Sequence, residues 1–354
     1  MSRLLVAQRA LTVPGWVKDE FSRKAQSIPS LDLRFADNKS LVDAVTGASL
    51  VTFTRASSGT FVGSDGLIKS ATTNEARFDH NPTTGESLGL LVEEARTNVL
   101  LNSATLSTQS VTVAAVANTL SFYGTGTVTL TGVSTAGPLV GTGANNRVSL
   151  TFTPTVGVLI LTVSGSVTNA QLEAGAFPTS YIPTVAATAT RAVDVASITG
   201  TNFSSWYNQT EGTFAWSGST YNTQYANQNA FRVTEGTNLR GIGFGLDART
   251  GTDDAYFSTR NNTTIASVNS SFPYVTVTSN IRIGGAFGTD IAASFNGSTP
   301  LVASPAYVFG TESQIEIMSN KQISGTANQY NGHTRRLTFW PTRLSNEVLQ
   351  RITQ

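Results

Sequence analysis

The chain contains no cysteine and few charged side chains, and these absences exclude several kinds of protein. Without cysteine there is neither a disulfide framework nor a thiolate metal site, and two histidines, His80 and His333, leave little material for a zinc site or a Ser-His-Asp triad. Of 354 residues, 23 are Lys or Arg and 22 are Asp or Glu, about half the fraction typical of soluble domains. A net charge of +1 creates no field that would attract nucleic acid.

Long hydrophobic runs are also missing. No apolar stretch approaches the roughly 18 to 20 residues that span a bilayer, and the first residues, MSRLLVAQRALTVPGW, break at Pro14-Gly15 without a signal-peptide segment. The sequence therefore predicts no membrane association. The chain instead has 89 Ser and Thr residues and 31 Gly, so its polar surface is built from uncharged hydroxyl and amide groups.

Residues 1–30 are the one stretch with a helical pattern before the final residues. Five basic and two acidic side chains give this segment a charge of +3, and Pro14-Gly15 divides it into two short pieces. We expect a partly helical arm that docks on a partner or oligomerises through its apolar side chains. These are Leu4, Leu5, Leu11, Trp16 and Phe21. Deleting residues 1–30 should then leave a folded β body that cannot dock.

From Leu31 onward the pattern has a period of two. Short runs rich in Thr, Val and Phe are separated by Gly, Asn, Asp and Ser, for example in residues 50–54, 127–131 and 158–163. This alternation is typical of antiparallel strands with one buried face. The predicted fold is all-β, with two consecutive antiparallel β-sandwich (jelly-roll) domains at 31–194 and 195–354 behind the arm. A capped helical turn beginning at Ser345 is expected at the end of the second domain.

The charged residues of the first domain are concentrated between positions 53 and 102. Turn-forming pairs such as Ser58-Gly59 and Asp65-Gly66 lie among them. Arginine forks that pair with carboxylates would fix these loops against the sheet. The predicted structural network is Arg55, Arg77, Asp79, Glu93 and Arg96.

An alternative interpretation makes Asp79, Glu93 and Glu94 an acid/base set with His80. Glu93 and Glu94 are adjacent in the sequence, so in a strand their side chains lie on opposite faces and cannot line one cleft. The sequence thus favours the structural interpretation, with no catalytic residue assigned.

Several long motifs in the first domain carry a family resemblance. TRASSGTFV, LIKSA, ARFDHNP and GLLVEEARTNVLLNS follow one another from residue 54, and AQLEAGAFPTSYIPT with ATRAVD closes the domain. This series resembles the signature of bacteriophage fibre, spike and tail-associated structural proteins, including head-spike fibres. The resemblance covers residues 31–194. It implies a virion protein with a jelly-roll module similar to carbohydrate-binding modules.

The second domain resembles the concanavalin A and laminin-G type of sandwich, through FSSWYNQTEGTFAW near its start and GHTRRLTFWPTRLSNEVLQRIT at its end. Calcium-dependent lectins of this type use clustered Asp and Asn ligands. The one comparable cluster, Asp253-Asp254 with Asn261-Asn262, lacks a convincing ligand spacing. We therefore expect no metal and no cofactor.

Sugar binding requires aromatic platforms together with amide or hydroxyl groups. Residues 206–225 contain both ingredients, although Trp206 and Trp216 are expected in the core. The candidate carbohydrate-binding residues are Tyr221, Tyr225, Tyr256, Asn222 and Gln224.

The sequence thus leads to a virion structural protein on the particle surface, a homotrimer that adheres to host surface polysaccharide through many weak sites. Its partners would be other virion proteins of the capsid, portal or tail. Two alternatives stay open. One is a decoration or adaptor protein with virion contacts alone, and the other is a polysaccharide-depolymerising spike, which would need two carboxylates across the scissile bond.

Overall fold

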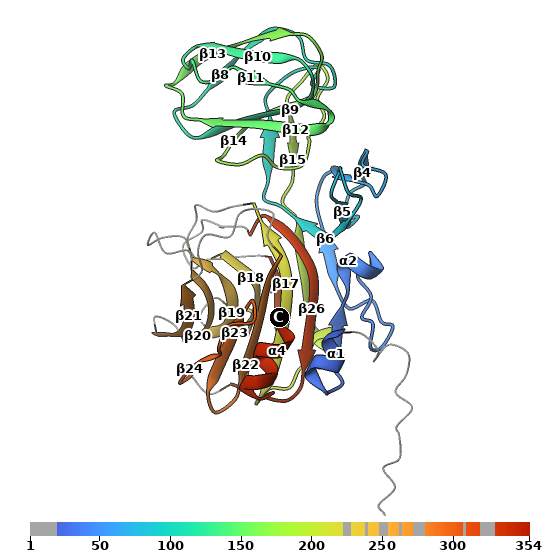
Figure 1. The fold of residues 1–354 in the computed structure, drawn as a ribbon, viewed down its shortest axis with the longest axis vertical. Helices are drawn as coiled ribbons and strands as arrows, with labels where there is room; N and C mark the ends of the chain where they lie inside the picture. The colour runs from blue at the N-terminus through green and yellow to red at the C-terminus, as the bar shows by residue number, and fades with distance from the viewer. Residues whose placement is uncertain are drawn as a thin grey trace, which may run out of the picture.

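The computed structural model describes residues 20–221, 228–237, 240–247, 254–261, 264–271, 280–306, 309–318 and 330–354. Figure 1 shows two β-sandwiches at opposite ends of the long axis, joined by a narrow neck. The expected all-β, antiparallel sandwich fold is confirmed. In the described part of the chain, no helix is both long and apolar enough to cross a membrane.

The larger unit, here called the body sandwich, consists of two antiparallel sheets. Within the described residues the first sheet has eight strands, with β1 pairing β26 beside the main path. Its strands are, in spatial order, β24 (Leu301–Ala303), β23 (Ile291–Phe295), β22 (Ile281–Phe287), β17 (Gly212–Thr220), β26 (Gly332–Trp340), β6 (Ser87–Val92) and β5 (Arg77–His80), with β1 at Leu31–Leu33.

The second sheet of the body sandwich has seven strands in the same described ranges. In spatial order these are β2 (Thr52–Thr54), β16 (Val195–Thr199), β25 (Gln314–Ile317), β18 (Gln228–Thr234), β19 (Arg240–Asp247), β20 (Asp254–Asn261) and β21 (Thr264–Ser271).

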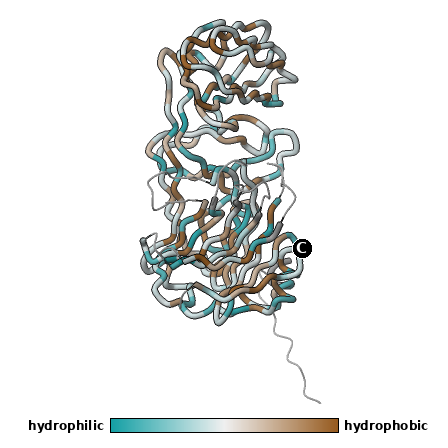
Figure 2. The backbone as a smooth tube through the Cα atoms, turned by 90° about the vertical axis from the view of Figure 1, so that its left-hand side faces the viewer, coloured by the Kyte–Doolittle hydropathy of each residue, from teal (hydrophilic) through white to brown (hydrophobic). Residues whose placement is uncertain are grey.

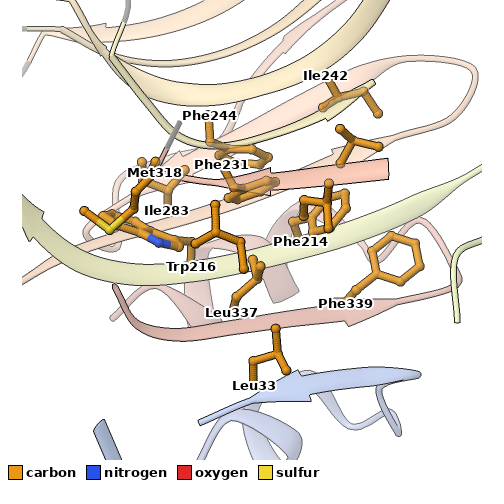
Figure 3. Close-up of a cluster of buried hydrophobic side chains, with 14 of the residues drawn as sticks. Leu33, Phe214, Trp216, Phe231, Ile242, Phe244, Ile283, Met318, Leu337 and Phe339 are labelled. Atoms are coloured by element: carbon orange, nitrogen blue, oxygen red, sulfur yellow. The ribbon is translucent and has the colours of Figure 1, made fainter. Parts of the chain in front are cut away.

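Aromatic side chains fill the space between these sheets. Figure 3 shows Phe231 and Phe244 of the second sheet facing Phe214 and Trp216 of the first. The ring centroids of Phe214 and Phe231 lie 4.8 Å apart across the interface. Trp206 and Trp216 are both buried in this core, as the sequence predicts. Burial of so many large apolar side chains is the main source of stability for a sandwich of this size.

The smaller unit, here called the tip sandwich, is made by β8 to β14. One sheet contains β11 (Leu139–Val140), β10 (Thr127–Gly132), β13 (Gly157–Ser164) and β8 (Gln109–Val113), and the other contains β12 (Gly143–Phe152), β9 (Asn118–Gly124) and β14 (Val167–Ala174). Leu120 and Phe122 of β9 pack against Leu130 and Leu161 of the facing sheet. Figure 2 shows hydrophobic and hydrophilic segments interspersed in both sandwiches, and the burial of β13 alternates along the strand as the period-two pattern predicts.

The neck consists of two short antiparallel elements. Strand β7 (Arg96–Asn98) leads into the tip sandwich and pairs with β15 (Ala189–Arg191), which returns from it. Beside them lies the hairpin of β3 (Gly59–Val62) and β4 (Ile68–Ala71). The helices are short and all belong to the body: α1 (Glu20–Ala25), α2 (Phe35–Asn38), α3 (Gly200–Ser204) and α4 (Asn346–Ile352).

The strand pairing corrects the expected domain boundaries. Strands β1, β5 and β6 of the expected first domain pair within the first body sheet, and β2 pairs with β16 in the second. The tip sandwich is therefore inserted into the body sandwich instead of preceding it. Alternation in a sequence identifies strands but not their partners, because strand pairing here joins residues more than a hundred positions apart.

The boundary of the arm at residue 30 is also wrong. Ala25 is buried beside Trp340, the Trp340 indole N–H donates to the Ser27 carbonyl (3.1 Å), and the Ser30 N–H donates to the Phe339 carbonyl (2.9 Å). Residues 20–30 thus belong to the body. Of the expected docking residues, Phe21 lies in α1, while Leu4, Leu5, Leu11 and Trp16 lie outside the described residues.

The chain ends as the sequence predicts. Strand β26 stops before Pro341, and α4 begins after Ser345, whose hydroxyl accepts a hydrogen bond from the Val348 N–H at 3.4 Å. This N-cap satisfies one of the free N–H groups of the first turn.

Gly89 allows β6 to lie against β26. Its φ is +95°, and a Cβ there would stand 2.2 Å from the Thr334 carbonyl oxygen. Gly47 provides a matched control, since its φ is +75° and no atom lies within 4 Å of the position of its Cβ. We expect Gly47→Ala to cost only the left-handed backbone strain of about 1 to 2 kcal/mol.

Gly89→Ala should lower the free energy of unfolding by at least twice as much as Gly47→Ala, because it adds a backbone clash to the same strain. Urea denaturation of the two variants and the wild type measures the difference. Equal losses would show that β6 can move away from β26 at no cost.

Candidate functional site

Five buried charged side chains meet where the neck joins the body. We call Arg55, Arg77, Glu93, Arg191 and Asp194 the charge clamp. Arg77 Nη1 lies 2.8 Å and Arg191 Nη1 3.1 Å from Glu93 Oε2. Arg77 also forms an ion pair with Asp194. Arg55 Nη1 lies 3.2 Å from Asp194 Oδ1, so Asp194 joins the two arginines. All five are buried, so the loss of one partner would leave an uncompensated charge out of water.

Hydrogen bonds connect the charge clamp to backbone from separate parts of the chain. The Glu93 N–H donates to Asp194 Oδ2 (2.9 Å), and Ser180 donates to Glu93 through its N–H (2.7 Å) and its hydroxyl (2.6 Å). Burial disfavours the ionised form of Glu93, but Arg191, Arg77 and the bonds from Ser180 outweigh burial and lower its pKa to about 2. Glu93 is therefore a fixed anion and not a general acid.

The structure brings three members of the predicted network together and places two elsewhere. Arg55, Arg77 and Glu93 belong to the charge clamp. Arg96 pairs with Glu94 and lies over the Phe177 ring, 5.0 Å from its centroid. Asp79 accepts from the Val62 N–H (2.6 Å) and from His333 Nε2 (2.9 Å).

Two members of the charge clamp, Arg191 and Asp194, were missed by the sequence analysis. The signal was present, because both lie in the motif ATRAVD that closes the first domain. The adjacent residues Glu93 and Glu94 take different partners, in agreement with the structural interpretation of this pair.

Next to the charge clamp is a cavity of about 330 Å³, here called the neck cavity. The tip sandwich contributes Tyr123, Arg147 and Ser149, the neck contributes the hairpin β3–β4, and the body contributes strands β5 and β6 and Tyr221. The segment 177–181 closes one side. Five aromatic rings are part of this lining: Phe61, Tyr123, Phe177, Tyr181 and Tyr221.

A chain of hydrogen bonds joins the wall of the neck cavity to β26. Asp79 can only accept, so His333 Nε2 carries the proton shared with it. The Tyr221 hydroxyl lies 2.9 Å from His333 Nε2 and 3.1 Å from Nδ1, and the Ser219 hydroxyl lies 3.3 Å from Nδ1. Burial, together with the nearby Asp79 and Glu93 charges, raises the pKa of Tyr221 well above its ordinary value. Tyr221 therefore keeps its phenolic proton and is not a nucleophile.

His80 and Arg147 give the neck cavity its remaining polar character. The His80 Nδ1–H donates to the Val62 carbonyl at 3.0 Å, which leaves Nε2 as an acceptor. This buried nitrogen has no hydrogen-bond partner among the described residues. Arg147 donates to the Thr179 carbonyl (2.6 Å) and the Ser121 hydroxyl (2.8 Å). It is the single charged residue of the sequence between Arg96 and Glu173.

The two predicted sugar-binding residues that the structure describes lie in different settings. Tyr221 lines the neck cavity, whereas Tyr256 is buried in β20 and donates to Asn229 Oδ1 at 2.9 Å, so it is not an exposed platform. Asn222, Gln224 and Tyr225 lie outside the described residues. Periodicity could not separate a buried tyrosine from an exposed one, because Tyr is found in both settings.

The Asp and Asn cluster that the sequence offers as a possible calcium site involves the two ends of β20. Asp254 and Asn261 are the first and last residues of this strand, and Asp253 and Asn262 lie outside the described residues. Among the residues that are described, no group of three His, Cys, Asp or Glu side chains could hold a metal ion.

Comparison with known proteins finds no matching family model and no matching curated protein. Solved structures show partial similarity. The Ruminococcus gnavus IT-sialidase CBM40 bound to alpha2,3 sialyllactose gives a TM-score of 0.35 at 13% identity over 41% of this chain and 83% of its own. A leech intramolecular trans-sialidase gives 0.35 at 14% identity, over 41% and 23% of the two chains.

A third structure is that of botulinum neurotoxin type C, whose cell entry is dependent upon interaction with two ganglioside molecules. It gives a TM-score of 0.34 at 12% identity. It covers 46% of this chain and 40% of its own. Similarity of this extent carries no information about ligand or activity.

Glu93 should make stability depend on pH. The pKa of Glu93 is about 2 in the folded state, below the ordinary 4.5. The stability that the ionised Glu93 contributes to the fold is therefore complete above pH 4.5 and is lost as the pH falls toward 2. We expect Glu93→Gln to lower the free energy of unfolding at neutral pH by about 3 kcal/mol and to flatten its dependence on pH in this window.

The matched control is Glu86→Gln, since Glu86 pairs with Arg335 at the surface and should contribute less than about 1 kcal/mol. Urea denaturation at pH 7 and at pH 3 measures both variants. A Glu93→Gln protein with the pH dependence of the wild type would contradict the prediction.

Proposed function

We propose that the chain is a structural protein of a bacteriophage particle, a fibre or spike on the head or tail, and that its neck cavity binds a sugar of the host surface polysaccharide. The observation that carries the binding proposal is the neck cavity itself. Its 330 Å³ and aromatic walls match the size and chemistry of small-ligand sites.

The polar groups of the neck cavity suit a ligand with many hydroxyl groups. A sugar hydroxyl can donate to His80 Nε2, which lacks a donor in the described structure, while sugar oxygens can accept from the walls. Sugar C–H faces pack against rings such as Phe61 and Tyr123. A site that buries one sugar ring binds its ligand weakly. Many copies of the protein on one particle would together give useful avidity.

The virion part of the proposal is supported by the sequence resemblance and by what its motifs do in the structure. Arg55 lies in TRASSGTFV, Arg77 in ARFDHNP and Glu93 in GLLVEEARTNVLLNS, while Ser180 and Asp194 lie in the closing motifs. The residues that carry the resemblance are thus those that build the charge clamp. A trimer on the particle surface, bound to capsid, portal or tail proteins, follows from the same resemblance.

A substitution that fills the neck cavity tests the binding proposal. Ser149 is exposed on β12 and lines the cavity, so Ser149→Trp should occupy the sugar site without removing a core side chain. Asn145→Trp is the matched control, because Asn145 is exposed on the same strand but does not line the cavity. On an array of bacterial surface polysaccharides we expect Ser149→Trp to weaken binding by more than about tenfold and Asn145→Trp to bind normally.

Each other result of this experiment contradicts the proposal. A wild-type protein that binds no polysaccharide would favour the decoration or adaptor alternative. Release of reducing ends, assayed on the same samples, would identify a depolymerising spike. Equal binding by both tryptophan variants would place the sugar site elsewhere.

Deletion of residues 1–19 tests docking to the virion. The deletion stops before α1, so it leaves the contacts of Ala25, Ser27 and Ser30 with the body intact. We expect a folded protein with the thermal stability of the full chain that is no longer incorporated into particles. Complementation of a phage that lacks the gene, followed by protein analysis of purified virions, gives the readout. Normal incorporation would exclude residues 1–19 as the docking segment.

A further inference from the structure

Three buried polar side chains form a compact group at the end of the tip sandwich that faces the neck. Gln171 and Glu173 are two positions apart on β14, so they share one face of the strand. Thr179 lies in the segment that follows and turns back over them. All three side chains are at most 1% exposed.

Glu173 contacts the other two members through both carboxylate oxygens. Its Oε2 accepts from the Thr179 hydroxyl at 2.7 Å, and its Oε1 accepts from Gln171 Nε2 at 2.5 Å and from the Thr179 N–H at 2.8 Å. In this arrangement the Glu173 carboxylate can accept from all three partners. An ionised carboxylate beside a hydroxyl is the arrangement of a general base and its nucleophile.

The carboxamide of Gln171 has the features of an electrophile. Its Oε1 accepts the Ile182 N–H at 2.6 Å, so a backbone donor already faces the oxygen on which negative charge would develop. Its Nε2–H donates to Thr179 Oγ1 at 3.3 Å, so the hydroxyl lies at the nitrogen end of the carboxamide, and a rotation of the Gln171 or Thr179 side chain must bring Oγ1 to the carbonyl carbon before it attacks. Arg191 Nη1, 3.2 Å from Thr179 Oγ1, stabilises negative charge on the hydroxyl oxygen.

We propose that Thr179 and Gln171 become joined by an ester bond that forms within the folded chain, with Glu173 as the proton carrier. This modification is independent of the proposed sugar binding and of the virion.

The step balances without any co-reactant. Glu173 takes the hydroxyl proton of Thr179, and Oγ1 attacks the Gln171 carbonyl carbon to give a tetrahedral oxyanion that the Ile182 N–H stabilises. The carbon–nitrogen bond then breaks as Glu173 returns the proton to Nε2, which leaves as ammonia. Glu173 is regenerated as a carboxylate, and no atom is oxidised or reduced.

The surroundings favour the product. Ammonia is protonated once it reaches water near neutral pH, which removes it from the equilibrium, and burial keeps water from hydrolysing the ester. The bond would fasten β14 to the segment 177–181, which forms one wall of the neck cavity and holds Glu93 through Ser180. A chain without cysteine would in this way obtain a covalent cross-link.

Mass spectrometry of the purified full chain tests the proposal. Trypsin cleavage after Arg147 and Arg191 places both residues in one peptide, residues 148–191, which we expect to be lighter than its sequence by one ammonia, about 17 Da. Fragment ions between residues 171 and 179 should be missing. Mild alkali should open the ester and leave Glu at position 171, so the peptide then exceeds its sequence mass by about 1 Da.

Variants separate the chemistry from folding. Thr179→Val removes the nucleophile and Glu173→Gln the base, so both should restore the full peptide mass. Thr179→Ser retains a hydroxyl and should still lose ammonia. The matched control is Thr119→Val, because Thr119 is equally buried and bonds Gly175 and Thr151 instead of Glu173. It should keep the mass loss.

A folded wild-type protein whose peptide 148–191 has its full sequence mass would overturn the proposal. So would a loss of ammonia located at Asn169-Ala170 within this peptide, where succinimide formation gives the same mass change. A mass loss that persists in Thr179→Val would equally exclude this ester.

Discussion

The buried ion pairs of the charge clamp are the interaction on which the rest of the structure depends. They join the end of β2, strand β5, the end of β6, the end of β15 and the start of β16, which belong to three different sheets. Glu93 precedes the strand that leads into the tip sandwich, and Arg191 ends the strand that returns from it. Hydrophobic packing holds each sandwich together, whereas charge determines how the tip is attached.

This arrangement departs from the usual distribution of charge in a protein, where ionised side chains are rarely buried. Here much of the small supply of charge is buried in the neck and body, as in the clamp and in the pair of Asp32 with Arg336. The tip sandwich, by contrast, presents hydroxyl, amide and aliphatic groups, and its one arginine, Arg147, lines the neck cavity. Contacts made by the outer surface of the tip should therefore depend little on ionic strength.

Sequence reasoning identified local features well and long-range ones poorly. Period-two alternation predicted the strands, Ser345 predicted the last helix, and the concentration of charge around Arg55, Arg77 and Glu93 predicted loops fixed by ion pairs. Neither the insertion of the tip sandwich nor the partnership of Glu93 with Arg191 could be read from the sequence, because both depend on pairings across about a hundred residues. The neck cavity was missed for the same reason, since its walls come from both sandwiches.

The paired strands of the neck also determine how the molecule would respond to mechanical force. Strands β7 and β15 pair in register from Asn98 with Ala189 to Arg96 with Arg191, and Figure 1 shows both running along the long axis between the two sandwiches. A force that pulls the tip along this axis is shared by the two strands in parallel. It therefore does not separate the hydrogen-bonded residue pairs of β7 and β15 one after another. The force passes to the clamp, at Glu93 before the start of β7 and at Arg191, the last residue of β15. The neck would thus behave as a stiff tether with two strands.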